Sequence, residues 1–83
     1  MNEQLLKLVS IRSGDEITYH HNDKLETGIV EGWLDRQLGD KWVKCVELTI
    51  CKLWVPVSAI VSRTRREGCG AGVIVFEEQG VNA

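Results

Sequence analysis

The stretch formed by residues 41–57 constrains the fold more than any other part of the sequence. Most of its residues are β-branched or aromatic, the types that favour extended strands. These seventeen residues exceed the length of one ordinary strand. We therefore predict two strands, at about residues 42–49 and 52–55, with a tight turn near residues 50–51. Pro56 should end the second strand, because proline has no backbone N–H to donate to a ladder.

Two further strands are predicted before this stretch. Residues 16–20 alternate, so that Ile17 and Tyr19 share one face. Residues 26–34 form the next apolar run. Gly28 and Gly32 within it indicate a bend, a bulge or the close approach of another backbone.

The two ends of the chain carry weaker signals. Residues 2–10 place Leu5, Leu8 and Val9 on one face at helical spacing, which fits a short helix or an extended arm. A single 3₁₀ turn over residues 57–60 should lead into a fifth strand near Val61. We predict an Arg- and Gly-rich loop over residues 63–72 and an extra strand over residues 73–78. Residues 79–83 should form a frayed end.

Taken in order, these signals predict one all-β domain over residues 1–83. The expected architecture is a small Src-homology-3-like barrel of about five antiparallel strands over residues 14–62. A short N-terminal helix or arm and the extra C-terminal strand would flank it. Alternation within the strands predicts five buried core residues: Ile17, Ile29, Val46, Leu48 and Ile60.

Three runs of the sequence follow the pattern of a known family. They are Gly14-Asp15, Gly28-Ile29-Val30-Glu31-Gly32-Trp33 and Pro56-Val57-Ser58-Ala59-Ile60. In these runs the chain resembles the plasmid- and integron-borne type II dihydrofolate reductases. The resemblance implies a Src-homology-3-like barrel, in a family that forms homotetramers around one pore. It also implies an origin in a mobile genetic element, such as an integron cassette.

The catalytic part of the family pattern is absent from this chain. Where the family lines its pore with Val-Gln-Ile-Tyr, residues 52–55 read Lys-Leu-Trp-Val, and a pore-facing lysine falls at Tyr19. Leu53 cannot make the hydrogen bonds of the family's glutamine amide. We therefore carry over no catalytic residue and expect no cofactor. An enzyme whose site forms between subunits stays as an alternative.

Composition argues against several classes of protein. The net charge is −2, from 12 acidic and 10 basic residues, whereas nucleic-acid binders usually carry a basic excess. No segment has the run of about 18 apolar residues that a membrane span requires. The first residues also lack the positive charge of a signal peptide. Three cysteines, an odd number, fit reduced thiols, so we expect a cytoplasmic protein.

The three tryptophans are the main candidates for an interaction surface. Both faces of residues 42–50 carry apolar side chains, although a five-stranded barrel has one interior. This surplus predicts Trp42 or Trp54 at a protein contact, unless the N-terminal segment or residues 73–76 cover it. Trp33, beside Gly32, is expected in the core or at the barrel rim.

The remaining motifs are weaker. Arg63, Arg65 and Arg66 could bind phosphate or an acidic partner, although a solvated loop is the simpler interpretation. The glycines of residues 68–72 precede a strand rather than a helix, which favours a hinge over a phosphate-binding loop. The histidines and cysteines lack metal-ligand spacing, so no metal site is predicted.

The sequence therefore predicts a small non-enzymatic binding module. It would self-associate as a homo-oligomer or dock on a foreign protein through its aromatic strands. The alternatives are an inter-subunit enzyme resembling the reductases and a nucleic-acid-binding barrel that uses the three arginines.

Overall fold

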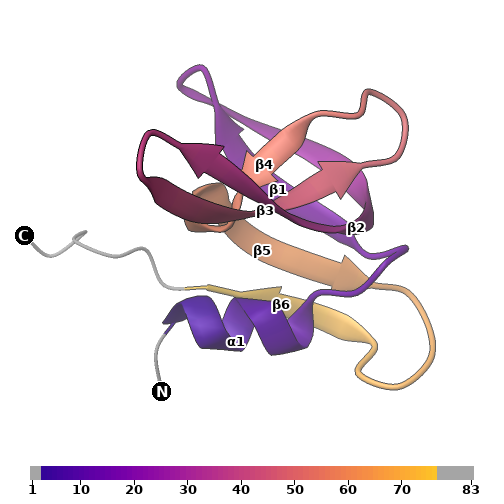
Figure 1. Cartoon of the computed structure of the whole chain (residues 1–83). Coiled ribbons are helices and arrows are strands. Elements are labelled where there is room, and N and C mark those ends of the chain that lie inside the picture. Colours follow the sequence, from indigo (N-terminus) through magenta and orange to yellow (C-terminus); the bar gives the residue numbers. More distant parts are fainter. Residues whose placement is uncertain (1–2, 77–83) are drawn as a thin grey trace, which may run out of the picture.

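The computed structural model describes residues 3–76, with one helix, one 3₁₀ turn and six strands (Figure 1). In chain order these elements are α1 (Glu3–Ser10), β1 (Glu16–His21), β2 (Lys24–Leu38), β3 (Lys41–Leu48), β4 (Trp54–Pro56), η1 (Val57–Ala59), β5 (Ile60–Arg65) and β6 (Gly72–Val75). The N-terminal segment is thus a helix. The predicted frayed tail over residues 79–83 lies outside the described residues.

The strands form one antiparallel sheet in the order β4-β3-β2-β1-β5-β6. β2 is 15 residues long and pairs with β1 along its first half and with β3 along its second. The register shifts between Val30 and Gly32, where the ladder passes from one partner to the other. A bulge of this kind bends a strand and lets the sheet wrap around a core. The predicted fold class, a small all-β barrel with a helix and an extra strand, is confirmed.

The core is built from the inner faces of five strands together with Ile11 and Phe76. Of the five predicted core residues, Ile17, Val46, Leu48 and Ile60 are buried. The prediction that Ile29 is buried is wrong, because 39% of this residue is exposed. Its neighbour Val30 takes the inner position. Because Ile29 and Val30 are both apolar, the sequence does not show which of them faces the core. A shift of one residue in the register moves every side chain of a strand to the opposite face.

The inner position two residues before Val30 is Gly28. A Cβ atom there would lie 2.7 Å from Cδ1 of Leu48, which is 2% exposed. Glycine lets a core side chain from β3 pack directly on the backbone of β2. This is one of the roles that the sequence indicated for Gly28.

Helix α1 has an unusual orientation. Leu5, Leu8 and Val9 do share a face, but that face is exposed, at 47%, 38% and 60%. Lys7 instead is 4% exposed, and its Nζ donates to the carbonyl oxygen of Val57 at 3.0 Å. The ammonium group also lies 5.6 Å from the ring centre of Phe76. The helix is therefore held to the barrel by Lys7 and by Leu6, which packs against the core, rather than by the stripe of Leu5, Leu8 and Val9.

The second half of the chain corrects three predicted boundaries. β5 extends to Arg65, so Arg63 and Arg65 belong to a strand and the loop begins only at Arg66. β4 begins at Trp54, because Lys52 has a φ of 58° and belongs to the turn. The extra strand is confirmed as β6, which pairs with β5 and ends at Val75. No helix within residues 3–76 is long and apolar enough to cross a membrane.

Candidate functional site

The pairing of β2, β3 and β4 separates their side chains into two sets. Trp33, Val46 and Val55 are paired in register and belong to or pack against the core. Because successive side chains of a strand alternate, their neighbours point away from the core. The apolar members of this second set define the outer face: Leu34, Leu38, Val43, Cys45, Trp54 and Pro56.

A tryptophan and an arginine cover the middle of the outer face. The guanidinium of Arg36 in β2 lies 5.5 Å from the ring centre of Trp54 in β4, so the two side chains meet across β3. Beneath them Val43 is half-buried and Cys45 is only 2% exposed. Burial raises the pKa of the Cys45 thiol, although the charge of Arg36 opposes the shift. Cys45 is therefore a packing residue of this face and not an activated nucleophile.

The rest of the outer face is open. Trp54 is 44% exposed, Leu38 is 49% exposed, and Pro56 is exposed as well. α1 and β6 lie on the far side of β5 from β3 and β4 (Figure 1). The charged residues of the same face are Arg36, Lys41 and Glu47. Lys41 and Glu47 lie towards the two ends of β3, while Arg36 lies with Trp54 over the centre. The face therefore has a largely apolar centre with charges at its ends, as in protein-binding surfaces.

The two candidate contact tryptophans lie on opposite faces of the sheet. Trp42 is 67% exposed and pairs with Gln37, one position out of phase with the outer face. It projects beyond the core at the tip of the β2–β3 hairpin. On the same side, Nζ of Lys44 lies 2.8 Å from Oδ1 of Asp35. A single contact surface cannot hold both Trp42 and Trp54.

Trp33 has a structural role. It packs against the core, and its indole Nε1 donates to the carbonyl oxygen of Ile11 at 3.2 Å. This bond ties β2 to the segment that follows α1. Trp33 thus lies at the core edge, as the sequence suggested, and is not part of the outer face.

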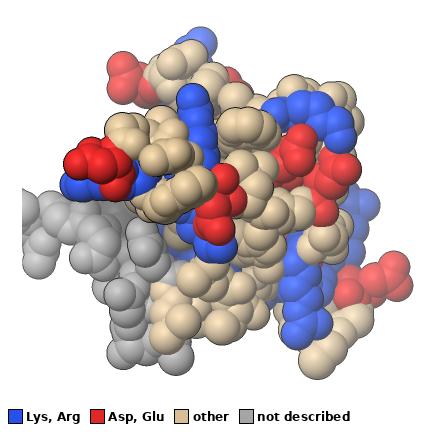
Figure 2. Space-filling view, viewed as in Figure 1, with Lys and Arg blue, Asp and Glu red and all other residues tan. Residues whose placement is uncertain are grey.

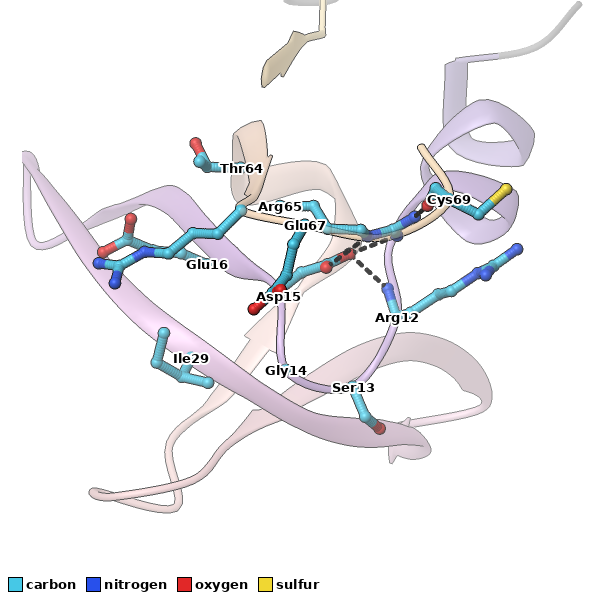
Figure 3. A pocket seen from close by; sticks show the side chains of 11 residues that line it. Arg12, Ser13, Gly14, Asp15, Glu16, Ile29, Thr64, Arg65, Glu67 and Cys69 are labelled. Carbon is cyan, nitrogen blue, oxygen red and sulfur yellow. Dashed lines mark hydrogen bonds and ion pairs between the residues drawn. The ribbon is translucent and has the colours of Figure 1, made fainter. Parts of the chain in front are cut away.

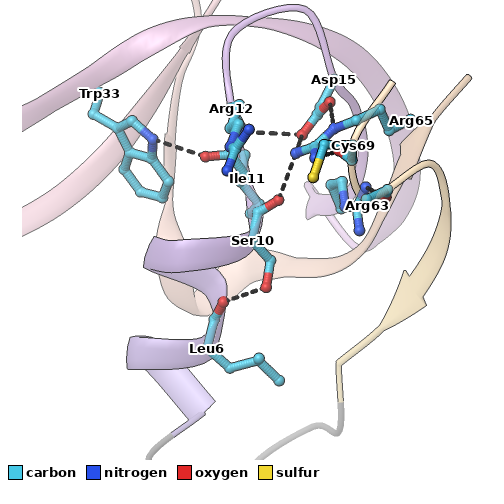
Figure 4. Close-up of polar contacts among 10 residues, drawn as sticks. Leu6, Ser10, Ile11, Arg12, Asp15, Trp33, Arg63, Arg65 and Cys69 are labelled. Atoms are coloured by element: carbon cyan, nitrogen blue, oxygen red, sulfur yellow. Dashed lines mark hydrogen bonds and ion pairs between the residues drawn. The ribbon is translucent and has the colours of Figure 1, made fainter. Parts of the chain in front are cut away.

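Arg65 is the centre of a polar network that joins both halves of the chain (Figure 4). Its Nε and Nη2 donate to the two carboxylate oxygens of Asp15 at 2.8 and 2.7 Å. Nη2 also donates to the carbonyl oxygen of Ser10, and Nη1 to that of Cys69. Asp15 in turn accepts the backbone N–H of Arg12 at 2.9 Å. All these contacts are with other groups of the same chain, so most of the donors of Arg65 are already used within the fold.

The network determines the ionisation of Asp15, which is 3% exposed. Burial alone would raise the pKa of this carboxyl. The hydrogen bonds from Arg65 and from the Arg12 backbone, together with the charges of Arg65 and Arg63, outweigh burial and hold the pKa below its ordinary value. Asp15 is therefore a buried carboxylate in a closed ion pair.

The other two arginines of the cluster differ in exposure. Arg63 is 2% exposed, its Nη1 donates to the carbonyl oxygen of Gly70 at 2.9 Å, and its Nε has no hydrogen-bond partner within the described residues. Arg66 is exposed. Arg63 and Arg65 thus hold the carbonyl groups of the loop before β6. These two carbonyl partners are only seven and four residues away, whereas Asp15, the charged partner of Arg65 that the sequence missed, is 50 residues away.

An open groove of about 610 Å³ lies beside this network (Figure 3). Three arginines and three acidic residues line it, including Arg12, Arg66, Glu16 and Glu67. In the face shown in Figure 2, acidic and basic side chains are likewise interspersed rather than gathered by sign. A groove without net positive charge has little affinity for phosphate. We therefore do not place a nucleic-acid site here.

Two of the positions that differ from the reductase pattern, Tyr19 and Leu53, are turned inward. Tyr19 is 3% exposed and belongs to the core, and Leu53 packs against it. Burial is also the main reason that the pKa of Tyr19 is raised. The described residues contain no group of three or more potential metal ligands. Comparison with protein families, curated proteins and solved structures gives no match.

Proposed function

We propose that this protein is a non-enzymatic binding module that docks a protein through the outer face. The observation that carries the proposal is the Trp54–Arg36 contact over β3, at the centre of an apolar sheet surface that stays open. Tryptophan and arginine are the residue types most enriched among the energetic centres of protein interfaces.

The energetics of this face favour docking. Burial of apolar surface contributes roughly 25 cal/mol per Å² before association costs. Leu38, Trp54 and Pro56 keep much of their surface in water. Val43 and Cys45 are already ordered beneath them, so a partner would immobilise few additional side chains.

The location of the face within the sheet supports the same conclusion. β4, the nearby edge strand, is three residues long and ends in a proline, which limits strand addition by a foreign chain. A partner would therefore meet side chains rather than free backbone groups.

A peptide-display selection tests this function without a known partner. The chain would be immobilised at low density, so that copies do not meet, and exposed to an unbiased library. We expect the enriched sequences to lose binding in Trp54→Gln and to keep it in Trp42→Gln. Trp42 is the matched control, because it is also an exposed tryptophan of the same sheet but lies on the opposite face. Enrichment that is unaffected by Trp54→Gln, or no enrichment, would contradict the proposal.

A further inference from the structure

The charges along β3 make its outer face complementary to itself. Lys41, Val43, Cys45 and Glu47 follow one another on this face, so the strand presents a cation at one end and an anion at the other. Lys41 and Glu47 are six positions apart, which spans roughly 20 Å at the rise of an antiparallel strand. Two apolar residues lie between the charges.

From this pattern, and resting on the proposed function of the outer face, we infer that the partner is a second copy of this chain. The two copies would stack their outer faces with their β3 strands antiparallel. Lys41 of each copy would then lie against Glu47 of the other, and the stacked Trp54 and Arg36 side chains, which cover Val43 and Cys45, would lie near the two-fold axis.

Symmetry leaves two simple ways to stack one strand on its own copy. A two-fold axis across the strands makes the copies antiparallel and gives two opposite-charge contacts. An axis along the strands makes them parallel and places Lys41 on Lys41 and Glu47 on Glu47. Like charges facing each other across an interface are unfavourable, so Lys41 and Glu47 favour the first arrangement. This arrangement also brings the two Arg36 guanidinium groups near the axis, which is one like-charge contact against two opposite-charge contacts.

The rest of the molecule is compatible with such a pair. The net charge of −2 produces little repulsion between copies. Closed two-fold pairs are the commonest outcome of self-association. Stacked sheets with nearly aligned strands are also a common packing arrangement.

Charge reversal tests the arrangement by sedimentation equilibrium. We expect the wild-type chain to form a dimer of the 9.3 kDa subunit. Lys41→Glu alone and Glu47→Lys alone should each dimerise about tenfold more weakly, because each creates two like-charge contacts. An equimolar mixture of the two variants should regain the wild-type affinity, because the heterodimer restores both opposite-charge contacts. A variant that failed to fold could not give this recovery.

Lys44→Glu is the matched control, because Lys44 belongs to the same strand but points to the other side. It should leave dimerisation unchanged. Three results would overturn the inference: a wild-type chain that stays at 9.3 kDa at the highest concentration reached, single variants that dimerise as well as the wild type, or a mixture that recovers nothing. None of these bears on the display selection, so the docking function and the identity of the partner are tested separately.

Discussion

Gly28 shows how one residue sets the packing of two strands. The buried side chain of Leu48 occupies the space that a side chain at this position would need. The sequence indicated a bend, a bulge or a close approach at this position, but it could not show which of these applies. That distinction depends on the register between β2 and β3, which only the tertiary structure provides.

We expect Gly28→Ala to lower the free energy of unfolding by about 2 kcal/mol, because the new methyl group overpacks the core. Leu48→Val removes a methylene group at the same point. The double variant should therefore lose less than the sum of the two single losses. Urea denaturation measures all three. Gly32→Ala is the control, since nothing lies within 4 Å of a Cβ there. Equal losses in Gly28→Ala and Gly32→Ala would contradict this packing.

Asp15 provides a prediction about pH. Its pKa in the folded chain lies below the ordinary value of 3.8. A carboxyl whose folded pKa is lowered stabilises the fold fully above its unfolded pKa, and this contribution is lost as the pH falls through the folded value. Asp15→Asn breaks the buried pair and should cost about 3 kcal/mol at neutral pH.

The difference in unfolding free energy between wild type and Asp15→Asn should shrink as the pH falls below 3.8. Other carboxyls titrate in both proteins and cancel in this difference. Urea denaturation at several pH values from neutral to acidic measures it. A difference that stays constant with pH would show that Asp15 is not held as a buried carboxylate.

At the scale of elements, α1 inverts the usual rule for an amphipathic helix. Periodicity correctly grouped Leu5, Leu8 and Val9, but it could not show which side faces the barrel. The position of the helix is set by the Lys7 ammonium on the carbonyl group of Val57, a partner 50 residues away. A contact at that separation leaves no trace in the local pattern.

Lys7→Ala should therefore destabilise the protein by about 2 kcal/mol, because it removes a buried hydrogen bond and leaves the carbonyl group of Val57 without this donor. Leu8→Ala should cost less, because Leu8 is 38% exposed. Lys7→Met keeps the packing of the side chain and should fall between the two. Thermal and urea unfolding compare them. A larger loss in Leu8→Ala than in Lys7→Ala would contradict the orientation of α1.

The strands were predicted well where composition alone determines them and less well where distant partners do. Residues 41–48 are rich in strand formers, and β3 lies where it was expected. The arginines of β5 read as a loop because three cations in four residues are rare in a strand. Carbonyl groups of the following loop accept hydrogen bonds from Arg63 and Arg65 over seven and four residues. Asp15, the charged partner of Arg65, lies 50 residues away, and no local rule could have found it.

At the scale of the whole molecule, the sequence predicted more apolar strand surface than one core can bury. It did not show where on the barrel that surface lies. Trp42 and Trp54 were both reasonable candidates, because alternation cannot assign faces across an unknown turn. The observed register separates them and joins Trp54 to Arg36 and Leu38. The pairing of the strands therefore defines the candidate site, whereas composition alone had made Trp54 a candidate for it.

One measurement tests the central claim, that the outer face and not the hairpin tip is the contact surface. The indole N–H of each tryptophan gives its own signal in a ¹H–¹⁵N NMR spectrum, and single Trp→Phe variants assign the three signals. In a dilution series from near-millimolar to micromolar protein, we expect the Trp54 signal to shift while the Trp42 signal stays constant. A shift of the Trp42 signal with a constant Trp54 signal would contradict the account, whereas no shift of either signal would overturn the self-association.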